Sequence, residues 1–198
     1  MWQEAEDFLL KDKYIGPSIK KWGHCTIQPK IHSDYFQTLV GEIIGQQLSG
    51  RVADVIENRL KNKVKGTLTP AKILKISDSE LRDCGMAWSK VRAITDLSER
   101  VKDKRLQINK LPELSENTVK DELIAVKGIG PWTADMFLMF TLGRPDIFPT
   151  EDLGIKKGFE KVTGKKWNKV DSPKFAETHW KPYRTVASWY LWRSLENR

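Results

Sequence analysis

Cysteine and long apolar runs are scarce in this sequence. The two cysteines among its 198 residues, Cys25 and Cys84, lie far apart and form no CxxC pair. A disulfide framework is therefore not expected, and a reduced, cytosolic protein is. No apolar run approaches the ~18 residues of a membrane-spanning helix. The acidic, amphipathic N-terminus lacks the features of a signal peptide.

Metal-ligand spacing and strand patterns are missing as well. The three histidines, His24, His32 and His179, fit no metal motif, so ordinary surface or loop positions are expected for them. Alternating runs of β-branched residues bounded by turns do not occur. Amphipathic segments are frequent instead, and they predict an all-α protein of about nine or ten helices.

Positive charge and tryptophan are abundant. The formal net charge is +8 and the pI about 9.4, which favours a polyanionic partner, nucleic acid before an acidic membrane. The alternative is a soluble protein that simply carries many lysines. Hydrophobic content of 39% and charged content of 30% indicate a globular chain. Most of the eight tryptophans are expected in its core, and a few on a base-stacking surface.

Periodicity and caps place several helices. Residues 36–48, 51–62 and 88–102 repeat apolar side chains at helical spacing. In 51–62 the predicted apolar face is Val52, Val55, Ile56 and Leu60. Caps at Thr69 and at Ser77-x-x-Glu80 open two shorter helices. Residues 12–34 show no period and are expected to form an irregular connector.

The stretch from 118 to 143 reads as helix, glycine hairpin and helix. The segment Thr118–Asp121 resembles a capping box that opens the first helix. Gly128-Ile129-Gly130 forces a turn, and Pro131 suits the first position of the next helix. Free N–H groups at such a helix start form an anion site, and a DNA phosphate is the natural anion. The alternative is a plain helix–helix turn.

The continuation of the hairpin carries a family resemblance. The run Leu-x-x-Val-Lys-Gly-Ile-Gly-Pro-Trp-Thr-Ala, followed by Phe148-Pro-Thr-Glu-Asp152, resembles the helix-hairpin-helix and Gly/Pro/Asp signature of base-excision DNA glycosylases. Ile44–Ser49 resembles the IxGQxxS segment of the 3-methyladenine DNA glycosylase II branch. The segments Gly85–Lys90 and His179–Trp192 resemble further motifs of that branch.

The resemblance implies a two-lobed helix-hairpin-helix glycosylase fold with a cleft between the lobes. One lobe would be residues 36–128, and the other 1–35 plus 129–198. The chain would be the minimal form without an N-terminal α/β domain. We expect a monomer that acts on double-stranded DNA containing damaged bases and binds no membrane. It would be cytoplasmic and nucleoid-associated in a prokaryote, or nuclear in a eukaryote.

Asp152 is the expected catalytic residue. An extended Phe148–Thr150 loop leads into a helix whose apolar face is predicted to be Leu153, Ile155, Phe159 and Val162. A carboxylate at a helix start is kept ionised by the helix dipole. An ionised carboxylate stabilises the oxocarbenium-like sugar of N-glycosidic cleavage. The alternatives are a simple capping acid at Asp152, or catalysis by Glu151.

Trp132 and Trp192 are implied to form the base pocket. In bifunctional members of the family a lysine attacks the sugar from the position that Trp132 holds here. We therefore expect a monofunctional enzyme that uses water and performs no lyase reaction. The π-face of Trp132 would favour cationic, alkylated purines.

The resemblance also implies DNA contacts and a bound ion. Gly128, Ile129, Gly130 and the Thr133 hydroxyl would bind phosphate. Gln47, with Leu48, would enter the vacated base stack, although solvated glutamines at a helix end are the alternative. Lys90 would reach a phosphate, unless it is an ordinary surface lysine. Main-chain carbonyls of Ile124, Val126 and Ile129 would hold a structural Na⁺ or K⁺.

No cofactor is expected to be required for activity. Two thiolates cannot supply the four ligands of the iron–sulfur cluster that some members of the superfamily carry, so no such cluster is expected.

Two other functions remain open from the sequence. One is a glycosylase of the same fold for a mismatched or oxidised base. The other is a helix-hairpin-helix DNA-binding module without catalysis. Asp152 argues against the binding module, and release of an alkylated base from DNA would separate all three.

Overall fold

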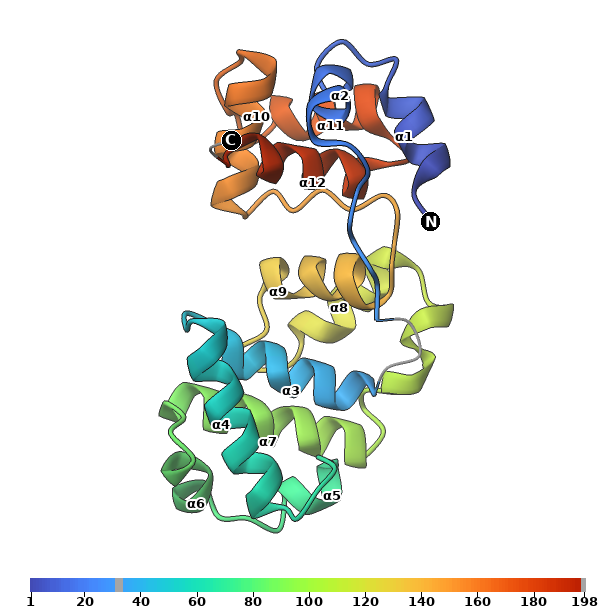
Figure 1. The fold of residues 1–198 in the computed structure, drawn as a ribbon. Helices are drawn as coiled ribbons and strands as arrows, with labels where there is room; N and C mark the ends of the chain where they lie inside the picture. Colours follow the sequence, from blue (N-terminus) through green and yellow to red (C-terminus); the bar gives the residue numbers. More distant parts are fainter. Residues whose placement is uncertain (31–33, 197–198) are drawn as a thin grey trace. The chain divides into compact units, whose positions relative to one another are not determined.

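The computed structural model describes residues 1–30 and 34–196, and these are all-helical with no β-strand. His32 lies outside the described residues. The described chain forms twelve α-helices, more than the nine or ten expected, and α2 is one that the sequence did not predict. Figure 1 shows their order along the chain, and their bounds are α1 Gln3–Leu9, α2 Gly16–Trp22, α3 Tyr35–Gly45, α4 Gly50–Lys63, α5 Pro70–Ile73, α6 Asp78–Asp83, α7 Trp88–Lys102, α8 Glu116–Ile124, α9 Pro131–Met136, α10 Leu153–Thr163, α11 Asp171–Trp180 and α12 Arg184–Ser194.

Two short helices of other types complete the described elements. A 3₁₀-helix, η1, covers Ile108–Glu113, and a π-helix, η2, covers Phe137–Thr141 directly after α9. Within the described chain, every helix is too short or too polar to traverse a lipid bilayer.

The chain divides into two compact units. Unit 1 combines Met1–Lys30 with Leu138–Arg198, and unit 2 is Ile31–Phe137. The predicted lobe boundary after residue 128 falls inside unit 2. Helix α9 stays with α8 because the two pack together and because Lys120 pairs with the buried carboxylate of Asp135 at 2.7 Å.

Unit 1 is built around an aromatic core on α10, α11 and α12. Phe159 makes edge-to-face contacts with Trp167, Phe175 and Trp180. Trp180 and Tyr190 are completely buried. Such arrangements add to the stabilisation from burial alone. Most tryptophans of this unit therefore serve the core, as the composition predicts.

A second helix, α2, lies in the segment predicted to be irregular. The Asp12 carboxylate accepts hydrogen bonds from the N–H groups of Tyr14 and Ile15, each at 2.9 Å. Pro17 stands in the first turn, and Gly23 ends the helix with φ of 72°. The segment was expected to lack structure because a seven-residue helix is too short to show a period.

The core of unit 2 lies between α3 and α7. Most of the predicted face of each helix is confirmed, since Leu39, Ile43, Val91, Ile94 and Leu97 are completely buried. Leu48 is an exception, because α3 ends at Gly45 and the Leu48 side chain is exposed. The predicted caps at Thr69 and at Ser77 and Glu80 are also present.

Two local predictions in unit 2 are wrong. Helix α8 starts three residues earlier than expected, because the Ser115 side chain, not that of Thr118, accepts the capping bond from the Thr118 N–H. On α4, Ile56 and Leu60 face the core, but Val52 and Val55 are each 45% exposed. Periodicity alone cannot distinguish a buried apolar stripe from one that continues onto the surface.

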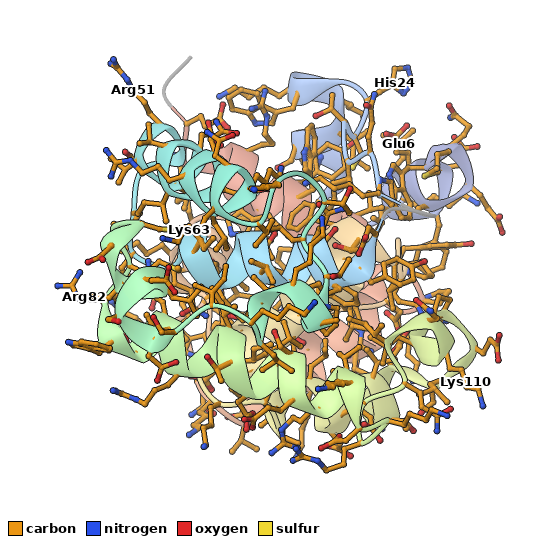
Figure 2. The ribbon with its side chains drawn as sticks, turned by 90° about the horizontal axis from the view of Figure 1, so that it is seen from below. Glu6, His24, Arg51, Lys63, Arg82 and Lys110 are labelled. Atoms are coloured by element: carbon orange, nitrogen blue, oxygen red, sulfur yellow. The ribbon has the colours of Figure 1, made fainter. Side chains whose placement is uncertain are left out.

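The surface of unit 2 is rich in basic side chains. In Figure 2, Arg51, Arg82 and Lys110 point away from the ribbon, and all three are exposed. Lys63 is held by Glu80 at 2.9 Å.

In unit 1, Glu6 is buried and accepts a hydrogen bond from the Cys25 N–H at 2.6 Å.

The packing of α10 against α12 predicts a strict glycine requirement. A Cβ added to Gly158 would stand 2.8 Å from the carbonyl carbon of Leu191, which is backbone and cannot move aside. We expect Gly158→Ala to lower the free energy of unfolding by about 1–3 kcal/mol, the usual cost of overpacking. Gly50→Ala is the control, because no atom lies within 4 Å of its Cβ position. Thermal and urea denaturation measure both, and equal stability of the two variants would contradict the close-crossing argument.

Candidate functional site

The hairpin between α8 and α9 requires glycine at only one of its two glycine positions. Gly128 has φ of 77°, and a Cβ there would lie 3.0 Å from the Cβ of Ala93 on α7. Gly130 has φ of −98° and open space around its Cβ position. Pro131 begins α9, as predicted. The turn is thus shaped by one left-handed residue and by contact with α7.

The hairpin is tied to α7 by a buried carboxylate that the sequence did not single out. Asp96 accepts a hydrogen bond from the Lys127 N–H at 2.9 Å and pairs with Arg100 at 2.8 Å. Burial disfavours the ionised form of Asp96, but these donors outweigh it, and the net result is a lowered pKa. Asp96 therefore remains a charged acceptor at neutral pH.

Thr133 and Gln46 form a contact that differs from the predicted one. Thr133 is buried, and its hydroxyl accepts from Gln46 Nε2 at 3.3 Å instead of facing solvent. The same amide nitrogen donates to the Gly128 carbonyl at 3.0 Å. Gln46 was overlooked because the sequence offers no signal for a hydrogen bond across 82 residues.

Lys90 has hydrogen-bond partners inside unit 2 that the sequence did not indicate. Its ammonium donates to the carbonyls of Ile44 at 2.6 Å and Gln46 at 2.8 Å, where it closes the C-terminal end of α3. Cations are favoured at this end of a helix. Partial burial lowers the pKa of Lys90. The structure thus gives Lys90 two internal partners, and its contact with a phosphate stays a prediction.

The turn that follows Gln46 is exposed. Gln47 adopts φ of 58°, and Leu48 is 38% exposed. Val52 and Val55 of α4 are exposed as well. A left-handed glutamine beside an exposed leucine is compatible with a segment that enters the base stack, and the wedge assignment stays a prediction.

Three carbonyls predicted to hold a monovalent cation lie where α8 ends and the hairpin begins. The Val126 carbonyl accepts from the Ile129 N–H at 3.2 Å, so the turn is closed by its own hydrogen bond. Oxygen donors at the negative end of a helix fit a hard cation. Ile124, Val126 and Ile129 would supply them, and the ion would then bridge the hairpin to a phosphate. This site also stays a prediction.

Asp152 stands at the start of α10, as predicted. Its Oδ1 accepts from the Ile155 N–H at 2.8 Å and from Trp192 Nε1 at 2.9 Å. The indole of Trp192 stacks on Phe140, with ring centroids 6.0 Å apart. Leu153, predicted on the apolar face of α10, is 63% exposed and takes no part in the core.

Gly154 makes the Asp152–Trp192 contact sterically possible. A Cβ at this position would lie 2.8 Å from Trp192 Cδ1 and 3.0 Å from Asp152 Oδ1. Together with Gly158, one turn later, it lets α12 approach α10 closely. Two glycines four residues apart in the sequence are a visible signal of such an approach.

The two tryptophans predicted for the base pocket lie in different units. Trp132 is 40% exposed in the first turn of α9, in unit 2. Trp192 is partly buried beside Asp152, in unit 1. The structure therefore brings Asp152 and Trp192 together, and a pocket shared by both tryptophans stays a prediction.

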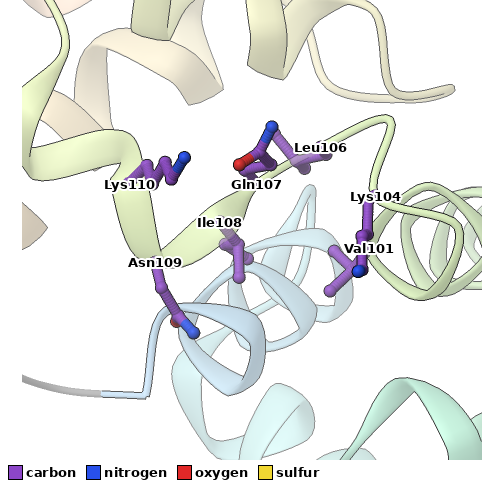
Figure 3. Close-up of a pocket in the computed structure, with 7 residues that line it drawn as sticks. All are labelled: Val101, Lys104, Leu106, Gln107, Ile108, Asn109 and Lys110. Carbon is purple, nitrogen blue, oxygen red and sulfur yellow. The ribbon is translucent and has the colours of Figure 1, made fainter.

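One pocket of unit 2 contains none of the predicted site residues. It lies where α7 passes into η1, has a volume of about 330 Å³, and is shown in Figure 3. Val101 is separated from Lys90 by eleven residues of α7, roughly 16 Å at 1.5 Å per residue. The lining residues are Val101, Lys104, Leu106, Gln107, Ile108, Asn109 and Lys110.

Comparison with known proteins identifies the family. Residues 40–184 match the model of the HhH-GPD superfamily of base excision DNA repair proteins, and the chain belongs to this superfamily. It is similar to the alkylbase DNA glycosidase-like protein mag2 of Schizosaccharomyces pombe, with 29% identity over 97% of this chain and 93% of that protein. It is 30% identical to the DNA-3-methyladenine glycosylase of Saccharomyces cerevisiae, over 96% of this chain and 78% of the relative.

Solved structures agree with this fold. The DNA-3-methyladenine glycosidase of Bacillus halodurans superposes with a TM-score of 0.85 at 33% identity, over 97% of this chain and 88% of that one. The Mag1 3-methyladenine DNA glycosylase of S. pombe, crystallised with abasic DNA, gives a TM-score of 0.82 at 28% identity, over 97% and 96%. The predicted all-α helix-hairpin-helix glycosylase fold is thereby confirmed.

The hairpin geometry predicts different outcomes for its two glycines. We expect Gly128→Ala to destabilise unit 2 by about 1–2 kcal/mol, because alanine disfavours the left-handed conformation. Gly130→Ala should leave stability nearly unchanged, because its backbone suits any residue. Urea unfolding of both variants checks this. Equal losses would show that the turn does not depend on the φ of Gly128.

Proposed function

We propose that this protein is a DNA glycosylase that hydrolyses the N-glycosyl bond of alkylated purines such as 3-methyladenine and 7-methylguanine in base excision repair. The observation that carries this proposal is the Asp152 carboxylate, held at the start of α10 by the Ile155 N–H and the Trp192 indole. The names of the relatives support the same substrate class.

Asp152 would act through its charge. As the bond to the base breaks, positive charge develops on the sugar, and a fixed carboxylate stabilises it. The carboxylate can also orient the attacking water. Both hydrogen bonds at Oδ1 restrict the rotation of the side chain, so little reorganisation is needed when the charge appears.

The proposed enzyme is monofunctional and belongs to the 3-methyladenine DNA glycosylase II branch. Trp132 occupies the position at which bifunctional members carry the nucleophilic lysine, and an indole cannot form a Schiff base. Its exposed ring can instead attract a cationic, alkylated purine by cation–π interaction. Such bases are already good leaving groups, so no general acid is required.

DNA would be bound through the hairpin. Main-chain N–H groups from Gly128 to Thr133, with the exception of Pro131, which has none, would contact a phosphate with help from the Thr133 hydroxyl. The Ile124, Val126 and Ile129 carbonyls would hold a Na⁺ or K⁺ that neutralises charge there. Phosphate contacts position the enzyme without reading sequence or lesion. Recognition of damage would then depend on the base that is flipped out of the helix.

Other lesions remain a second candidate. Structures of 8-oxoguanine glycosylases and of endonuclease III resemble this chain at 18–23% identity, which establishes a common fold and no common substrate. Methylated DNA and 8-oxoguanine DNA therefore need to be compared in one assay. A chain that binds both duplexes but releases no base would be a binding module.

Base release from methylated duplex DNA, read by chromatography, tests the proposal. We expect 3-methyladenine and 7-methylguanine to be released without strand cleavage. Asp152→Asn should reduce the rate by at least about a hundredfold while DNA binding persists. Asparagine keeps an oxygen for the Ile155 and Trp192 hydrogen bonds and is itself a good N-cap, so the change removes charge alone.

Glu151→Gln is the matched control. Glu151 is exposed and lies 3.9 Å from Lys156, and its loss should leave the rate near wild type. If Glu151→Gln were slow and Asp152→Asn remained active, the catalytic charge would be assigned to Glu151 instead of Asp152. Release of 8-oxoguanine alone would replace the substrate assignment.

The exposed turn predicts a second functional effect. We expect the double variant Gln47→Ala, Leu48→Ala to bind undamaged duplex normally but to excise more slowly from paired DNA. Excision of a lesion opposite a gap should be slowed less, because less stacking must be broken before the base is extruded. Single-turnover rates on the two substrates measure this. Wild-type rates on both would place the wedge elsewhere, with the Trp88–Lys90 turn as the next candidate.

A further inference from the structure

The exposed Gln47–Leu48 turn and the hairpin are joined by a chain of hydrogen bonds within unit 2. Lys90 of α7 donates to the carbonyls of Ile44, in the last turn of α3, and of Gln46, directly before the Gln47–Leu48 turn. The side chain of Gln46 then reaches the hairpin at Gly128 and Thr133. Gln46 therefore takes part twice, through its carbonyl and through its amide.

Helix α7 anchors both ends of this chain. Lys90 lies in its first turn, and Ala93, one turn later, meets Gly128 of the hairpin. Asp96 then accepts the Lys127 N–H. Residues 90, 93 and 96 recur at helical spacing and share one face of α7. The turn and the hairpin are thus mounted on the same rigid element, and Gln46 closes the gap between them.

We propose that Lys90 and Gln46 are positioning residues that lock the Gln47–Leu48 turn to the hairpin, so that the segment which fills the base stack and the segment which grips the phosphate keep a fixed separation. The inference rests on the proposed function for its purpose. Misplacing one contact relative to another by about 1 Å is enough to slow an enzyme about a hundredfold. Hydrogen bonds to a charged donor are stronger than neutral ones, which suits Lys90 to this task.

Two backbone amides report on the lock in the free protein. The Leu48 N–H bonds to the Gly45 carbonyl at 3.1 Å in the turn, and the Ile129 N–H bonds to the Val126 carbonyl at 3.2 Å in the hairpin. Their hydrogen-exchange rates measure local opening at each place. This readout needs neither DNA nor activity, so it decides the coupling even if the proposed function fails.

Lys90→Met keeps the length of the side chain and removes its donors. We expect it to speed exchange at Leu48 by about tenfold or more, the usual effect of losing a hydrogen bond to a charged group. Exchange at Ile129 should also rise, although Lys90 donates to the Ile44 and Gln46 carbonyls and not directly to the hairpin, because the loosened Gln46 can no longer hold Gly128. Lys90→Arg retains charge and donors and should restore most of the protection. Lys102→Met, at the exposed far end of α7, is the control.

Gln46→Met removes the bonds from Gln46 to Gly128 and Thr133, and so tests the hairpin side of the network. It also replaces Lys90→Met as the test if that variant does not fold. It should speed exchange at Ile129 and, by reciprocity, at Leu48, with Gln107→Met as its control. Combining Lys90→Met with Gln46→Met should add little to the larger single effect, because both act on one network. A response confined to the substituted segment, or fully additive effects, would overturn the proposal.

Excision assays then test whether the lock serves the reaction. Both variants should slow excision from fully paired methylated DNA by about tenfold or more, and slow it less when the lesion faces a gap. Wild-type excision by both variants on paired DNA would overturn the positioning role. Absence of base release by the unmodified protein would instead count against the proposed function and leave the exchange result standing.

Discussion

The contact of Gly128 with Ala93 is the constraint on which the architecture of unit 2 depends. At residue 128 a side chain would crowd Ala93 and would disfavour the left-handed backbone, so glycine is what allows the hairpin to lie against α7 without strain. That approach brings the Lys127 N–H to Asp96 and the Gly128 carbonyl to Gln46. The Asp96 and Gln46 side chains thus tie two backbone groups of the hairpin to the rest of unit 2.

In unit 1, glycines likewise allow two elements to approach closely, here the helices α10 and α12. Gly154 and Gly158 let α12 approach α10, and the approach places the Trp192 indole on Asp152. A tryptophan in a helix–helix contact needs a partner for its N–H. Here the partner is the Asp152 carboxylate, which also caps α10. The single oxygen Oδ1 therefore fixes both the start of α10 and the orientation of the Trp192 indole. The candidate catalytic group is thereby placed on regular secondary structure instead of on a mobile loop.

The sequence predicted those features that depend on neighbouring residues. The helices 36–48 and 88–102, the caps at Thr69 and Ser77, the hairpin and the start of α10 at Asp152 all follow from local patterns. The role of Lys90 and the contact of Gln46 with Gly128 did not, because they join residues 44 and 82 positions apart in the chain. Val52, Val55 and Leu153 were assigned to a core because an apolar period does not reveal how wide the buried stripe is.

Asp152 shows why capping and catalysis are hard to distinguish from sequence. A capping oxygen and a catalytic charge make the same demand at the start of a helix, since both require a short polar side chain there. Asparagine satisfies the first and not the second, because it keeps the oxygen and loses the charge. The fold alone would accept either residue at position 152. Capping requires neither the hydrogen bond that Asp152 accepts from the Trp192 indole nor the space that Gly154 leaves for that indole. These two features therefore suit Asp152 to a role beyond capping.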